Sequence, residues 1–128
     1  MTRPIEYLDL DDVLWLAERL LGATLSVRDV GLLGSAIARP RTTVGGTDAY
    51  PDVWAKAAAL LQSIVHNHAL VDGNKRLGWL TTAVFLELND APATAASNDD
   101  VFELVMGIAS GHVELATIEE RLRRIIIE

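Results

Sequence analysis

Hydrophobic residues recur at intervals of three and four positions along most of the chain, the spacing of a helix with one buried face. In the first such stretch they are Val13, Leu14, Ala17, Leu20 and Leu21. Asp9 before this stretch is a typical N-cap, Asp12 adds an acidic first turn, and Gly22 can end the helix. The pattern therefore predicts a helix between Asp9 and Gly22, preceded by a short strand over residues 5–8.

A second helix is predicted from Asp29 to Arg39, where Pro40 stops it. Its inward positions are expected to be Leu32, Leu33, Ala36 and Ile37. The pattern then changes to a β-branched stretch with a central glycine pair, made of Thr42, Thr43, Val44, Gly45, Gly46 and Thr47. β-branched residues on both sides of a Gly-Gly pair favour a small hairpin, or flap, although an ordinary surface loop is equally compatible with the sequence.

The longest apolar stretch, WAKAAALLQSIVHNHA, begins soon after Pro51. Its apolar residues cover most of the helix circumference, which predicts a buried central helix. Another apolar helix should run from Gly73 to about Leu88. Ser97 and Thr117, each followed three residues later by an acidic residue, are expected to start two more helices. The elements together predict an all-α fold with one small β-hairpin, in a single domain over residues 1–128.

Composition narrows the classes of function. The chain has 128 residues and a net charge of −7, which argues against an extended nucleic-acid or anionic-membrane footprint. It contains no cysteine, which excludes disulfides and thiolate metal sites. The N-terminal residues lack the apolar run of a signal peptide, and no segment reaches about 18 unbroken apolar residues. We therefore expect a soluble, cytoplasmic protein that contacts neither nucleic acid nor membrane directly.

Polar chemistry is concentrated in residues 68–79, HALVDGNKRLGW. A helix is predicted to begin there, and the first turn of a helix has unpaired N–H groups and a positive dipole end that attract anions. Gly73 removes a side chain that would keep a ligand from this backbone, while Asn74 can hold the loop or a ligand oxygen. Lys75 and Arg76 add two cations suited to phosphate oxygens. The stretch thus predicts a phosphate site.

His68 lies less than two helical turns before this predicted phosphate site. Histidine is the residue type that titrates near neutrality, so it can accept a proton from an attacking hydroxyl. Asp72 can orient a Mg²⁺ ion that is bound together with phosphates. These parts describe phosphoryl transfer, in which the protein supplies positioning and charge. In the alternative interpretation Asp72 is only an N-cap, and Lys75 and Arg76 are a solvated first turn.

Residues 68–76, HALVDGNKR, resemble the signature of the Fic/Doc family, H-x-F-x-[DE]-[GA]-N-[GK]-R. The lysine at position 75 makes the motif most similar to the Doc (death-on-curing) toxins, because Fic enzymes have glycine there. The stretches YLDLDDVLWLAERLLG and GLLGSAIARPRTTVGG also look like segments of Doc proteins. The resemblance implies a Fic/Doc-like helical bundle, with His68 as general base and the 72–76 loop as an anion hole.

The function implied by the resemblance is that of a toxin kinase. It would transfer the γ-phosphate of ATP, with Mg²⁺, to a Ser or Thr hydroxyl of a translation elongation factor of the Tu type, and a cognate antitoxin would restrain it. The implied catalytic residues are His68, Asp72 and Arg76, and the implied phosphate ligands are Gly73, Asn74, Lys75 and Arg76, with Asp72 serving the metal. The flap at 42–47 could offer a strand edge on which the target docks.

Two departures from the family pattern bear on the reaction and its control. Fic adenylyltransferases have a second arginine at the position of Trp79, so this chain lacks one phosphate clamp and has Lys75 in addition. The family's inhibitory pattern, [ST]-x-x-x-E-[GN], is incomplete, since Ser110 and Glu114 are followed by Leu115. Two alternatives therefore stay open: transfer of a nucleoside monophosphate, and a catalytically idle binding module of a toxin–antitoxin complex.

Overall fold

Six α-helices and one hairpin make up the part of the chain that the structure describes, residues 3–111 and 113–127 of a computed structural model. The elements are α1 Leu10–Leu21, α2 Val30–Ala38, β1 Thr43–Val44, β2 Thr47–Asp48, α3 Val53–Asn67, α4 Asn74–Leu88, α5 Asn98–Ala109 and α6 Leu115–Ile127. Short 3₁₀ turns, Gly22–Thr24 and Arg39–Arg41, follow α1 and α2. The predicted all-α fold with a small hairpin is confirmed. Within these residues no helix combines the length and the apolar character needed to cross a membrane.

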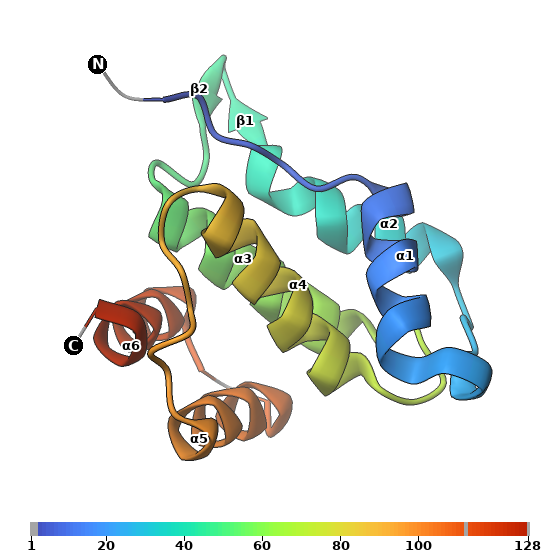
Figure 1. Cartoon of the computed structure of the whole chain (residues 1–128). Helices are drawn as coiled ribbons and strands as arrows, with labels where there is room; N and C mark the ends of the chain where they lie inside the picture. The colour runs from blue at the N-terminus through green and yellow to red at the C-terminus, as the bar shows by residue number, and fades with distance from the viewer. Residues whose placement is uncertain (1–2, 112, 128) are drawn as a thin grey trace.

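Helix α3 lies at the centre of the molecule, as predicted (Figure 1). It contacts α2, α4, α5 and α6, and its alanines Ala57, Ala58 and Ala59 are fully buried. Such small side chains let neighbouring helices approach α3 closely. Gly78 on α4 has the same effect, because a Cβ atom there would lie 3.0 Å from a methyl of Val65. The close packing of α3 against α4 fixes the two ends of the loop that joins them.

Local capping explains where several helices begin. Asp9 and Asp12 form a capping box: Asp12 N–H donates to Asp9 Oδ1 (2.9 Å), and Asp9 N–H donates to Asp12 Oδ2 (3.0 Å). Asp29 is the N-cap of α2 and Ser97 that of α5, and the side chain of each accepts from a single N–H group of the first turn. Gly22 follows α1 with a positive φ of 53°. The predicted starts at Asp9 and Ser97 and the end at Gly22 are confirmed.

Three local predictions are wrong. Residues 5–8 form no strand; instead the amide side chain of Asn89 bonds to both the N–H and the C=O of Glu6, each at 2.9 Å. Helix α6 begins before Thr117, because the N–H groups of Thr117 and Ile118 already donate to Glu114 O. Leu32 was expected to face inward but is 40% exposed, since α2 buries only a narrow face against α3.

The predicted hairpin is present. Thr43 pairs with Asp48 and Val44 with Thr47, and the turn is made by Gly45 and Gly46, which both have positive φ. Lys56, on α3, anchors this hairpin from below: its buried Nζ donates to Asp48 Oδ2 (3.0 Å) and to the main-chain oxygen of Tyr50 (2.6 Å). The hairpin therefore sits beside the first turns of α3.

Candidate active site in the loop between α3 and α4

The loop that joins α3 to α4 is shaped by two residues with positive φ. His68 ends α3 in the left-handed conformation (φ 50°, ψ 44°), and Gly73 is the N-cap of α4 with φ 93°. Non-glycine residues seldom adopt such a conformation, and those that do are frequent at functional sites. Figure 1 shows the end of α3 and the start of α4 at the same end of the molecule, and His68 is the C-cap of α3.

A segment from the α1–α2 connection clamps this loop from outside. Arg28 N–H donates to Ala69 O (2.8 Å), and Val71 N–H donates to Ser26 O (2.9 Å). The Arg28 guanidinium adds a charged contact, because Nε donates to the main-chain oxygen of His68 (3.1 Å) and Nη2 donates to the same oxygen. The sequence carries no local signal for this role of Arg28, since the partners are 40 positions apart. Arg28 thus positions His68 without belonging to the motif.

Asn74 holds the same loop from inside. Its Oδ1 accepts from the N–H of Leu70, and its Nδ2 donates to the C=O of Leu70, both at 3.0 Å. A single amide side chain thereby satisfies both main-chain groups of a fully buried residue. Of the two roles expected for Asn74, the structure shows the loop-holding one, and phosphate binding by Asn74 stays a prediction.

Gly73 is required by packing as well as by its backbone conformation. The residue is buried, and a Cβ atom built on it would lie 2.9 Å from both δ carbons of Leu21 on α1. Openness to a ligand was the expected reason for glycine at this position. The structure supplies a different reason, because the space that a side chain would fill is taken by Leu21.

The charged side chains of the motif are exposed around this framework. His68, Asp72, Lys75 and Arg76 all lie on the surface at the loop or in the first turn of α4. Asp72 is not the N-cap of α4; its Oδ1 accepts from the N–H of Gly73 (2.9 Å), one residue before the helix. In a helix the N–H groups of the first turn have no intrahelical acceptor, so residues 74–76 offer donors beside two cations. This arrangement can bind a polyanion next to a histidine.

The carboxylate content of the site determines which metal it can hold. Over residues 3–111 and 113–127, no three His, Cys, Asp or Glu side chains gather into a group that could cage a metal ion. Asp72 offers one carboxylate in the loop directly before the first turn of α4. Mg²⁺ is commonly held by one or two carboxylates together with substrate phosphates and water. The residues thus fit a Mg²⁺ that arrives with a nucleotide, with Asp72 as the protein ligand.

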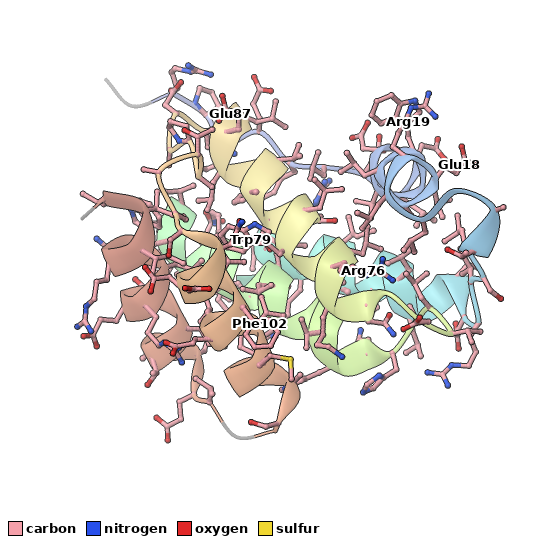
Figure 2. All side chains as sticks on the ribbon, turned by 60° about the horizontal axis from the view of Figure 1, so that its bottom comes forward. Glu18, Arg19, Arg76, Trp79, Glu87 and Phe102 are labelled. Carbon is pink, nitrogen blue, oxygen red and sulfur yellow. The ribbon has the colours of Figure 1, made fainter. Side chains whose placement is uncertain are left out.

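An apolar groove of about 460 Å³ leads away from Lys75 and Arg76 between α4 and α5. Its remaining lining residues are Leu20, Trp79, Leu80, Ala83, Asn98, Val101, Phe102, Val105 and Met106. Phe102 is 65% exposed, and Figure 2 shows Trp79 and Phe102 on the side where α4 faces α5. The sequence did not single out Phe102, because its helix, α5, carries apolar residues on more than one face.

The structure does not bring the hairpin and His68 together. The hairpin lies beside the start of α3 and His68 follows its end, so the two lie at opposite ends of α3 (Figure 1). A helix of 15 residues is about 22 Å long. A target that docks on residues 42–47 would have to extend along α3 to reach His68.

Two comparisons with known proteins agree with this geometry. Residues 7–86 match the model of the Fic/DOC family, a range that contains the hairpin and the whole loop between α3 and α4. A curated relative from Mycolicibacterium smegmatis (strain ATCC 700084 / mc(2)155), named Toxin Doc, is 48% identical over 118 residues. That alignment covers 91% of this chain and 91% of the relative.

Proposed function

The chain belongs to the Fic/DOC family, and on that premise we propose that it is the toxin of a toxin–antitoxin pair and a protein kinase. The resemblance carried by residues 68–76 is confirmed at the level of the family. In the proposed reaction the γ-phosphate of ATP passes to a Ser or Thr hydroxyl of another protein. The observation that supports this reaction best is the placement of His68 in one loop with the exposed Lys75 and Arg76 at the start of α4.

The proposed transfer assigns one role to each charged group. A ring nitrogen of His68 accepts the proton of the Ser or Thr hydroxyl while the hydroxyl oxygen bonds to the γ-phosphorus. The bond between that phosphorus and the oxygen of the leaving ADP breaks. Lys75, Arg76 and the first-turn N–H groups of α4 hold phosphate oxygens. Mg²⁺, held by Asp72, would neutralise phosphate charge. Arg28 and Asn74 keep His68 in place, because they hold the main chain of the loop from outside and from inside.

The choice between phosphate and AMP transfer depends on which phosphorus faces the acceptor hydroxyl. In adenylyl transfer the α-phosphorus lies there and a second arginine clamps the phosphates beyond it. At that position this chain has Trp79, whose indole has one N–H donor and no charge. Lys75 adds a cation nearer to the loop. Loss of a cation at one place and gain at another favours a nucleotide that presents its γ-phosphate, so we place AMP transfer second.

The proposed protein substrate is a translation elongation factor of the Tu type, whose modification would arrest translation in the cytoplasm. This part of the proposal rests on the likeness of the motif to that of the Doc toxins. The chain's charge of −7 favours a protein substrate over nucleic acid. The same net charge is the reason why we propose no direct contact with a membrane, since an anionic membrane surface attracts proteins with a cationic face.

We propose the cognate antitoxin as the second partner, with an amphipathic helix that lies in the groove between α4 and α5. The groove combines an apolar lining, including the exposed Phe102, with Lys75 and Arg76 at one end. That combination suits a helix with an apolar face and an acidic residue near the site. Phe102→Asp should then abolish neutralisation by the antitoxin without reducing toxicity, whereas Glu103→Gln, at the next exposed position of α5, should leave neutralisation unchanged.

Mass spectrometry of cellular proteins after expression of the chain without its antitoxin tests the proposal. We expect growth arrest and a protein that gains one phosphate on Ser or Thr, and we expect neither with His68→Ala, a variant of an exposed residue that should stay folded. A gain of AMP would favour the second reaction. Growth arrest without any covalent change, equal for the wild type and His68→Ala, would favour the idle binding module.

A further inference from the structure

A polar groove of about 430 Å³ lies between α2 and α3, on the path from the hairpin to His68. It is lined by Ser35, Ala38, Arg39, Thr42, Ser63 and Asn67. Thr42 leads directly into β1, and Asn67 directly precedes His68. An extended segment that reaches His68 from the hairpin would therefore pass along this groove.

The cation in this groove is Arg39, which is half-buried and held in place by neutral groups. Its Nε donates to Tyr50 Oη, and its Nη1 donates to Gln62 Oε1 and Ser63 Oγ, all at 2.8 Å. The ion pairs within the described residues involve Arg3, Lys56, Arg123 and Arg124. Arg39 has no carboxylate partner among those residues, although the chain carries a net charge of −7. A rigid guanidinium without an internal anion is well suited to an external carboxylate.

We propose that this groove binds an Asp or Glu side chain of the protein substrate and that Arg39 is a specificity-determining residue. The proposal rests on the proposed function for the identity of the bound chain. Ser63 precedes His68 by five positions, or about 7.5 Å along α3, which an extended chain spans in about two or three residues. The acidic residue should therefore lie two or three positions from the hydroxyl that is modified.

Ser35 offers the cleanest way to change the charge of the groove. Arg39 itself ties together Tyr50, Gln62 and Ser63, so its replacement also loosens the fold. Ser35 is exposed on α2 and lines the groove. Ser35→Asp places a carboxylate beside Arg39, Ser35→Lys adds a second cation, and Ser35→Asn changes the size in a similar way without charge.

Binding to an array of hexapeptides tests the proposal whatever group is transferred. Each peptide carries one central Thr and, two or three positions away, Asp, Glu, Asn or Gln. The full-length wild-type chain should bind each peptide with Asp or Glu with at least about tenfold higher affinity than the matched peptide with Asn or Gln, which is the usual effect of a charge-assisted hydrogen bond. Ser35→Asn should keep this preference, Ser35→Asp should lose most of it, Ser35→Lys should increase it severalfold, and Arg39→Gln should abolish it.

The outcomes separate this inference from the proposed function. Equal binding of acidic and amide peptides by the wild type, or equal behaviour of Ser35→Asp and Ser35→Asn, would overturn the inference even if the chain phosphorylates its target. Loss of the acidic preference in saturating ATP would overturn it too, because the groove would then be a nucleotide subsite. An acidic preference in a chain that transfers no label from ATP would support the inference and overturn only the kinase assignment.

Discussion

Replacement of Gly73 by alanine perturbs the loop at the point where backbone conformation and packing coincide. The φ of 93° is a conformation that costs a residue with a Cβ atom roughly 1–2 kcal/mol. The new Cβ would also lie 2.9 Å from both δ carbons of Leu21, well inside the 3.5–4.0 Å optimum for carbon contacts. Overpacking of this kind costs about 1–3 kcal/mol. Gly73→Ala should therefore lower the free energy of unfolding by about 2–5 kcal/mol.

Urea denaturation of four variants, namely Gly73→Ala, Gly45→Ala, Leu21→Ala and the double variant of Leu21→Ala with Gly73→Ala, separates the two contributions. Gly45→Ala is the matched control, because Gly45 has a φ of 58° with nothing within 4 Å of a Cβ atom, so only the strain of about 1–2 kcal/mol applies. In a Leu21→Ala background the clash is absent, and Gly73→Ala should cost no more than Gly45→Ala does. Equal losses for Gly73→Ala and Gly45→Ala in the intact chain would refute the packing argument, and so would a Gly73→Ala loss unchanged by Leu21→Ala.

Three further changes test the support of the loop and the core. Asn74→Ala removes both hydrogen bonds to Leu70 and should lower the free energy of unfolding in urea by about 2 kcal/mol. Asn74→Asp keeps the acceptor and should lower it by about half as much. A loss under about 0.5 kcal/mol for Asn74→Ala would contradict this role of Asn74. Arg28→Ala frees the main-chain oxygen of His68 and should slow phosphate transfer at least tenfold, with a loss of stability near 1 kcal/mol. Arg28→Lys should be intermediate. Full activity of Arg28→Ala would show that His68 does not need the contact with Arg28. Thr81 has a buried Oγ1 without a partner in the described residues, so Thr81→Val should leave Tm unchanged or raise it, and a clear fall would point to a bound water.

The parts of the fold that the sequence predicted are those with local causes. The capping box of Asp9 and Asp12, the cap at Ser97 and the Gly-Gly turn of the hairpin all depend on residues within a few positions of one another. The same holds for the buried central helix, which follows from a long stretch whose apolar residues cover most of the helix circumference. The wrong start of α6 is a failure of the same kind of signal, because Glu114 forms the first turn before the capping-box pattern at Thr117 begins.

The parts that the sequence did not predict depend on contacts between distant segments. The Arg28 guanidinium donates to the main-chain oxygen of His68, 40 positions away. Leu21, which lies on a different helix from Gly73, fills the space that a side chain at position 73 would need. The motif showed which residue types share the loop, but their support by Arg28 and Leu21 appears only when α1, α2 and α4 are packed. The separation of the hairpin from His68 is likewise set by the length of α3 and by the anchor at Lys56.

Transfer of radioactive label from ATP to purified elongation factor Tu measures the proposed reaction itself. ATP labelled at the α position and ATP labelled at the γ position are supplied separately with Mg²⁺. The mass of the elongation factor is then measured by mass spectrometry. We predict label from the γ position only, a mass increase of one phosphate group, and no label with His68→Ala. Label from the α position would contradict the kinase assignment, and transfer that persists in folded His68→Ala would contradict the role of His68.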